Sequence, residues 1–158
     1  MSNSARVLTA ADLNSVVGRY KKENKKIVFT NGCFDLLHIG HVTYLEEAKK
    51  LADVLIVGVN SDSSVSKLKG PSRPLQNESD RSRILAALKA VDHTVVFSEE
   101  TPLELIKSIK PDVLVKGGDW KIDQIVGSDF VLSYGGEVKS LNFVAGKSTT
   151  ALIEKSKI

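Results

Sequence analysis

Short runs of apolar residues alternate along the chain with longer amphipathic stretches. Most of the apolar runs are rich in β-branched residues, which is typical of strands that are covered on both faces. They predict five strands, over residues 27–29, 54–59, 94–97, 113–115 and 138–143.

The amphipathic stretches between these runs predict helices. Val42, Leu45, Ala48 and Ala52 recur at helical spacing, so we expect a helix over residues 40–51. Four more are expected, over residues 79–90, from Thr101-Pro102 to just before Pro111, over residues 122–133, and from Ser148 or Thr149 to the C-terminus.

Strands that alternate with helices require a parallel sheet with right-handed crossovers. We therefore predict a Rossmann-like, doubly wound α/β fold. No repeat, low-complexity tract or linker divides the sequence, so residues 1–158 are expected to form a single domain. Ligands of such folds bind outside the C-terminal ends of the strands, and residues just after strands are the first candidates for chemistry.

Composition narrows the class of protein. Hydrophobic residues make up 42% and charged residues 26%, as in ordinary globular proteins, which excludes a disordered chain. The one cysteine, Cys33, excludes an internal disulfide and a cysteine-rich zinc site. A formal charge of +3 is too small to indicate nucleic-acid binding. Strand-sized apolar runs and an N-terminus unlike a signal peptide predict a cytoplasmic protein with no membrane segment.

Two histidines follow the first predicted strand. His38 and His41 are three residues apart at a helix start, so their rings can project from one face. Gly40 between them allows a ligand to approach the backbone, and the first-turn amides favour a phosphate. This pattern predicts a triphosphate site, in which imidazole N–H groups stabilise charge on phosphate oxygens. A capping or surface role for either histidine is the alternative.

Three cations are further candidates. Lys69 lies in a segment rich in glycine and proline, expected to be a mobile arm that brings an ammonium to the phosphates. A solvated surface role is the alternative, and it fits Lys67 better. Arg73, between two prolines, is expected to clamp an acceptor phosphate, although a surface role fits the sequence nearly as well. Arg81 opens a predicted helix, where a cation opposes the helix dipole, and this favours a phosphate partner.

Ser148 and Thr149 begin the last predicted helix and offer two hydroxyls and first-turn amides to phosphates. Helix capping is the rival explanation, and both roles can coexist. A P-loop is excluded because Leu141 stands where that motif requires glycine. Asp35 is the candidate for holding Mg²⁺ or orienting the acceptor, although Mg²⁺ takes few protein ligands and its full ligand set stays unknown. Cys33 is expected to be a small packing residue.

The motif Gly32-x-Phe34-Asp35-x-x-His38-x-Gly40-His41 resembles the signature of the cytidylyltransferase-like nucleotidyltransferases. Class I aminoacyl-tRNA synthetases share its His-x-Gly-His part, but this chain is too short and has no Lys-Met-Ser-Lys-type loop. Further segments resemble one branch of the family, the D-glycero-β-D-manno-heptose 1-phosphate adenylyltransferases. These are residues 59–62, 68–74, 81, 101–102, 115–120, 136–138 and 148–150.

This resemblance implies transfer of AMP from ATP to heptose 1-phosphate, with Mg²⁺ accompanying ATP, to make ADP-heptose for lipopolysaccharide or another surface glycan. Such a reaction needs in-line positioning and charge neutralisation. The implied catalytic residues are His38, His41 and Lys69. The implied nucleotide-binding residues are Asn31, Gly32, Cys33, Phe34, Gly40, Gly118, Asp119, Trp120, Ser148 and Thr149. Asp35, Arg73, Arg81 and Lys116 are implied to bind the acceptor. For residues 116–120 a plain turn between strand and helix is the alternative.

Many relatives carry a sugar kinase as a first domain, for which this chain has no room. We therefore expect a stand-alone transferase that forms a homodimer and depends on a separate heptose kinase. Two alternatives are a cytidylyltransferase acting on glycerol 3-phosphate or another small phosphorylated acceptor, and a non-catalytic nucleotide-binding module. The first is disfavoured because Phe143 stands where those enzymes typically have arginine. The second is disfavoured by the joint presence of His38, His41, Lys69 and Ser148.

Overall fold

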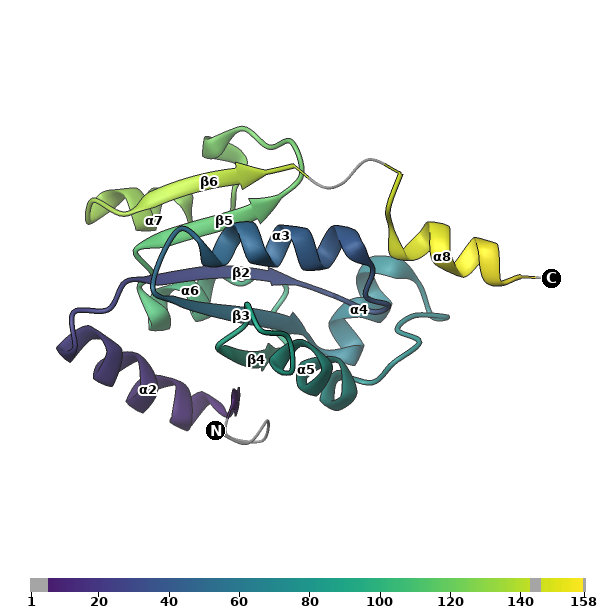
Figure 1. The fold of residues 1–158 in the computed structure, drawn as a ribbon, viewed down its shortest axis with the longest axis horizontal. Coiled ribbons are helices and arrows are strands. Elements are labelled where there is room, and N and C mark those ends of the chain that lie inside the picture. The colour runs from purple at the N-terminus through teal and green to yellow at the C-terminus, as the bar shows by residue number, and fades with distance from the viewer. Residues whose placement is uncertain (1–5, 143–145, 158) are drawn as a thin grey trace.

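A computed structural model describes residues 6–142 and 146–157 of the chain. Within these residues a six-stranded sheet forms the centre of the molecule, and all of its strand pairs are parallel (Figure 1). The strands lie in the order β1 (Val7–Leu8), β4 (His93–Phe97), β3 (Val54–Asn60), β2 (Ile27–Gly32), β5 (Val113–Gly117) and β6 (Glu137–Leu141). The predicted parallel α/β fold is confirmed.

Helices connect these strands and cover both faces of the sheet. They are α2 (Ala10–Lys22), α3 (Ile39–Lys49), α4 (Asp62–Lys69), α5 (Glu78–Ala86), α6 (Leu103–Ile109), the 3₁₀ turn η1 (Ile122–Gln124), α7 (Ser128–Ser133) and α8 (Thr149–Ser156). Among the described residues, no helix is both long enough and apolar enough to span a bilayer.

The structure differs from the prediction in several elements. Strand β1 and helices α2 and α4 were not expected, and α4 replaces part of the predicted mobile arm. The helix predicted over residues 122–133 is divided into η1 and α7, because Ile125 is extended and Gly127, the N-cap of α7, has φ 86°. The last predicted strand ends at Leu141, and Phe143 lies outside the described residues.

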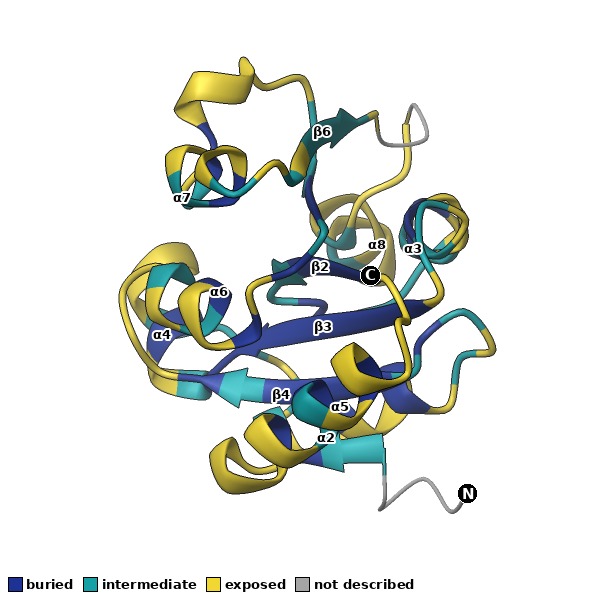
Figure 2. Cartoon of the chain, turned by 90° about the vertical axis from the view of Figure 1, so that its left-hand side faces the viewer, coloured by how far each residue is buried: buried dark blue, intermediate teal, exposed yellow. Residues whose placement is uncertain are grey.

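Alternate side chains of each strand enter two hydrophobic layers. On one face, Phe29 and Ile56 pack in a cluster with Leu13 of α2 and Ile106 of α6. On the other, Val28 and its neighbours pack with residues of α3 and α5. Every residue of β3 is buried, as Figure 2 shows. This two-sided burial explains why the strands are continuous apolar runs.

Strand β2 lies between β3 and β5, so the chain leaves β2 toward one side of the sheet and later returns on the other. This is the topological switch point at which doubly wound folds bind ligands, beyond the carboxyl ends of the strands. The histidine motif follows β2 directly and is therefore placed at that crevice.

Candidate active site

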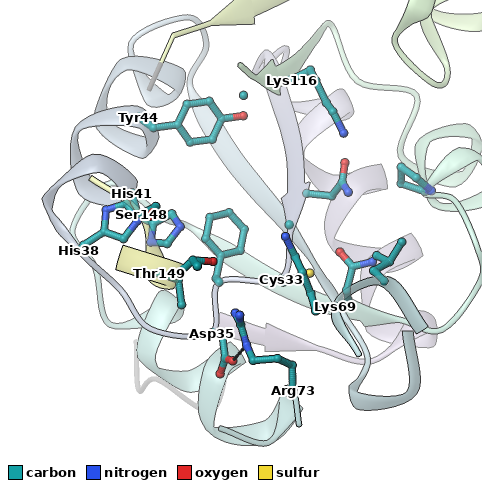
Figure 3. Close-up of a pocket in the computed structure, with 18 of the residues that line it drawn as sticks. Cys33, Asp35, His38, His41, Tyr44, Lys69, Arg73, Lys116, Ser148 and Thr149 are labelled. Atoms are coloured by element: carbon teal, nitrogen blue, oxygen red, sulfur yellow. Dashed lines mark hydrogen bonds and ion pairs between the residues drawn. The ribbon is translucent and has the colours of Figure 1, made fainter. Parts of the chain in front are cut away.

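A cavity of about 620 Å³ opens at the carboxyl ends of β2, β3 and β5. Its size is in the range of small-molecule sites. Most residues that the sequence predicted for the site do line it, although they come from segments far apart in the chain (Figure 3). These are Asn31, Gly32, Cys33, Phe34, Asp35, His38, His41, Lys69, Arg73, Lys116, Ser148 and Thr149.

His38 is both the N-cap of α3 and a wall of the cavity. Its Nδ1 accepts a hydrogen bond from the Gly40 amide at 3.1 Å. A neutral His38 ring therefore carries its proton on Nε2, where it can donate to a ligand. Burial and the nearby Lys147 ammonium lower the pKa of His38. Capping and ligand binding are thus compatible roles for this residue.

His41 stacks against His38, with ring centroids 3.9 Å apart and an interplanar angle of 26°. The edge of Phe34 contacts its ring at 5.2 Å between centroids. Burial, and then the neighbouring His38, lower the pKa of His41 to about 4. Within the part of the chain that the structure describes, the buried Nδ1 of His41 has no hydrogen-bond partner. The ring is therefore neutral at pH 7 and keeps an unused polar atom.

Gly40 is required by the histidine pair itself. A Cβ at this position would lie 2.8 Å from two atoms of the His38 ring and 3.4 Å from the Cβ of Lys147. Gly40 does not line the cavity, so the close approach that it permits is between α3 and the His38 side chain. The structure thus gives Gly40 a packing role in place of the ligand approach that the sequence predicts.

The start of α8 faces the same cavity. The Ser148 hydroxyl caps α8 by accepting from the Ala151 amide at 2.9 Å. The Thr149 hydroxyl donates to the Leu36 carbonyl at 2.8 Å, which fastens α8 to the loop between β2 and α3. The N-terminus of α8 is consequently held beside the histidine pair, where its amides favour an anion.

Lys69 reaches the cavity from a different direction. It is the last residue of α4, and not part of the mobile arm that the sequence suggested. Its ammonium lies close enough to Cys33 to oppose the rise in the pKa of that thiol caused by burial. The lysine thus faces the end of β2 from a short, regular helix.

The Asp35 carboxylate accepts hydrogen bonds from other residues of the protein. Its carboxylate accepts from Arg73 Nε at 2.7 Å and from the amides of Leu75 and Gln76 at 2.9–3.0 Å. Burial alone would raise the pKa of Asp35, but these hydrogen bonds and the Arg73 charge lower it overall. The side chain holds residues 73–76 against the β2–α3 loop and fixes Arg73 at the cavity wall.

These contacts do not fit the predicted role of Asp35 in holding Mg²⁺. Its oxygens already accept hydrogen bonds from three residues. Across residues 6–142 and 146–157, no group of three or more His, Cys, Asp or Glu side chains is placed to hold a metal ion. A divalent ion in this cavity would have to take most of its ligands from phosphates and water.

Arg81 is not at the cavity. It is 1% exposed, and its guanidinium donates to the carbonyls of Gln76, Cys33 and Asn60 and to the Asp62 carboxylate, at 2.7–2.9 Å. The structure therefore does not support the expected contact between Arg81 and an acceptor phosphate, because the guanidinium donates to protein oxygens instead.

Gly118, Asp119 and Trp120 also do not line the cavity. The Trp120 Nε1 donates to the Gly117 carbonyl at 3.1 Å, and its ring lies 5.2 Å from the Lys116 ammonium. The residue is 45% exposed. In this structure Trp120 supports Lys116, which does line the cavity, from outside.

Sequence reasoning missed ten lining residues. Two of them, Asn60 and Gly117, are the last residues of β3 and β5, a signal that was available in the predicted strands. Tyr44 lies one helical turn after His41. The missed residues are Tyr44, Asn60, Leu68, Glu100, Thr101, Pro102, Gly117, Val126, Lys147 and Thr150.

The parallel sheet, the cavity at its switch point and the histidine pair beside a helix start define an α/β domain built to bind a phosphorylated ligand. A sequence model of the cytidylyltransferase-like family matches residues 29–153. The chain belongs to this family and is a nucleotidyltransferase, and the resemblance in its motifs is confirmed.

Similar curated proteins support this family assignment. The chain is 54% identical over 143 residues to the "Bifunctional protein HldE" of Syntrophotalea carbinolica, covering 90% of this chain and 29% of the relative. It is 60% identical over 134 residues to the protein of the same name from Nitratiruptor sp., covering 85% of this chain and 28% of that protein. The chain thus spans under a third of the length of these relatives.

Solved structures show the same fold. A lipopolysaccharide core biosynthesis protein from Thermoplasma volcanium matches 76% of this chain and 97% of its own, with a TM-score of 0.61 and 32% identity. Pantothenate synthetase from Thermus thermophilus matches with a TM-score of 0.58 over 88% of this chain and 62% of its own. Its 19% identity makes it a likeness of fold alone.

Proposed function

We propose that the chain transfers AMP from ATP to D-glycero-β-D-manno-heptose 1-phosphate, forming ADP-heptose and pyrophosphate. A phosphate oxygen of the sugar attacks the α-phosphorus, and the bond from that phosphorus to the bridging oxygen of pyrophosphate breaks. The observation that carries the proposal is the convergence of the His38–His41 pair, Lys69 and the start of α8 on one cavity. This set supplies charge and position rather than a covalent nucleophile, as direct transfer requires.

Each group has a distinct part in this scheme. The triphosphate lies between the histidine pair and the N-terminus of α8, and the neutral imidazoles donate hydrogen bonds to oxygens that gain charge in the transition state. Lys69 adds a positive charge from α4. Because Asp35 takes the Nε of Arg73, we assign the two terminal nitrogens of that guanidinium to the acceptor phosphate.

Heptose 1-phosphate is chosen as the acceptor because of the relatives. Bifunctional HldE proteins match nearly the whole chain at 51–60% identity. A reaction that places a phosphate on the anomeric oxygen must supply the acceptor, and we propose that a heptose kinase activity does so. The homodimer and the cytoplasmic location stay predictions. Mg²⁺ remains part of the proposal as the ion that accompanies ATP.

The test is pyrophosphate release from ATP, CTP, GTP and UTP, each with the heptose 1-phosphate or with glycerol 3-phosphate. We expect turnover with ATP and the heptose. Turnover with CTP and glycerol 3-phosphate would assign the chain to the other branch of the family. Nucleotide binding without any pyrophosphate release would favour the non-catalytic module.

A further inference from the structure

Arg81 has the largest fully buried side chain of the described residues, and it belongs to α5. A buried guanidinium is costly unless all of it is paired. Here Nε donates to the Gln76 carbonyl at 2.9 Å, and Nη1 donates to the carbonyls of Cys33 and Asn60 at 2.7 and 2.8 Å. Nη2 pairs with Asp62 at 2.8 Å. Four of the five N–H groups of Arg81 thus donate to protein oxygens, so the side chain acts as a connector.

Its partners come from three segments that build the cavity. Cys33 begins the β2–α3 loop, which carries the histidine pair, and Asn60 ends β3; both residues line the cavity. Asp62 begins α4, the helix that ends at Lys69. Gln76 follows the segment of Arg73, and its amide and side chain also bind Asp35. One side chain thus joins the histidine loop to both cation-bearing segments.

We propose that Arg81 is a positioning residue of the nucleotidyl-transfer site, which sets the spacing between the His38–His41 loop and the α4–α5 segment that carries Lys69 and Arg73. This inference rests on the proposed function, because it assigns Arg81 a part in that reaction. Only a planar fork with several fixed donors can satisfy oxygens from four residues at once. Lysine keeps the charge but cannot reproduce the fork.

The first test compares Arg81→Lys with Arg83→Lys. Arg83 is exposed on the same helix, so its variant controls for loss of an arginine from α5. We expect Arg81→Lys to lower kcat by about 10- to 100-fold, the effect of displacing a reacting group by about 1 Å. The dissociation constant for ATP alone should stay within about threefold of the wild-type value, because the histidine pair and α8 remain. Equal activity of the two variants would overturn the proposal.

A double-mutant cycle separates positioning from general destabilisation. If Arg81 acts through Lys69, the losses in kcat caused by Arg81→Lys and Lys69→Met should be clearly less than additive when combined. Full additivity would show that Arg81 does not act through Lys69 and would overturn the proposal.

Amide hydrogen exchange gives a readout that needs no turnover. We expect Arg81→Lys to speed exchange in residues 33–37 and 62–77, with the sheet strands unchanged. Uniformly faster exchange, or no change, would overturn the proposal. Asp62→Asn removes one partner at the surface end of the network and should give a weaker form of the same pattern if Arg81→Lys fails to fold. A wild-type protein inactive with every substrate pair would refute the proposed function, whereas the exchange pattern would still decide whether Arg81 fixes these segments.

Discussion

The ring of His38 lies 3.9 Å from the ring of His41, centroid to centroid, and its Nδ1 is held by the Gly40 amide. The lowered pKa values of both rings favour their neutral forms, in which each imidazole keeps one N–H that can donate to an anion. The hydrogen bond from Gly40 fixes one ring, and stacking then fixes the other. The pair is prepared for a phosphate before any ligand binds.

Replacing His41 with alanine should remove most of the activity and leave the fold intact. The ring stabilises charge that develops in the transition state, so we expect turnover to fall by about 10²- to 10⁴-fold. Pyrophosphate release measures the loss, and circular dichroism with thermal unfolding checks the fold. Near-normal turnover in a folded variant would remove His41 from the mechanism.

The same histidine should make stability depend on pH. The pKa of His41 is about 4 in the folded protein, against 6.5 for an ordinary histidine. Between these values the unfolded chain binds more protons, so the free energy of unfolding should fall as pH is lowered from about 6.5 to 4. The full shift corresponds to about 3 kcal/mol, and solvent screening of a partly exposed ring reduces this to about 1–2 kcal/mol.

Denaturant unfolding of the wild type and of His41→Asn across this pH range provides the measurement. The variant should show a shallower loss of stability, although His38 and His93 have pKa values lowered in the same direction and keep part of it. Parallel curves for the two proteins would contradict the predicted pKa of His41.

Lys69 and Lys67 offer a matched pair on α4. Both are exposed, but of the two only Lys69 lines the cavity. We expect Lys69→Met to lower turnover by about 10²-fold, because a positive charge near the phosphates is lost, and Lys67→Met to leave it unchanged. Steady-state kinetics of the two variants compare them directly. Equal effects would mean that only the general charge of α4 matters.

Asp35→Asn should loosen the segment that follows α4. The substitution leaves the Arg73 guanidinium, whose side chain is 13% exposed, beside a neutral amide. We expect a loss of about 2–3 kcal/mol in the free energy of unfolding, at the low end for a broken buried pair because Arg73 can reach water. Glu47→Gln, which breaks the exposed pair with Lys50, is the control and should cost less than about 1 kcal/mol. Similar losses in both variants would show that Asp35 contributes no more than a surface charge.

Strands β2 to β5 were predictable because each is a short, largely buried apolar run, whereas the two-residue β1 gave no such run. The site that follows β2 was predictable as well. Helix α4 was not, because its sequence from Asp62 to Ser66 is rich in residues that favour turns and caps. Helix α2 had a usable signal in Leu13, Val17 and Tyr20, which recur at helical spacing and are buried. The burial of Arg81 could not be foreseen, because two of its partners are the backbone carbonyls of Cys33 and Asn60, which are distant in sequence.

Trp120 is the sole tryptophan of the sequence, so its fluorescence reports on one position. Trp120 is 45% exposed and its ring lies against Lys116 outside the cavity, whereas stacking on a base would bury the ring. We therefore expect acrylamide to quench its emission to the same extent with and without saturating ATP, within about 20% for an indole that stays half in water. Trp120→Phe keeps an aromatic face for Lys116 and should retain at least about half of the wild-type turnover. Strong protection from acrylamide by ATP would instead mean that the loop of residues 117–120 closes over the nucleotide and brings the ring onto its base.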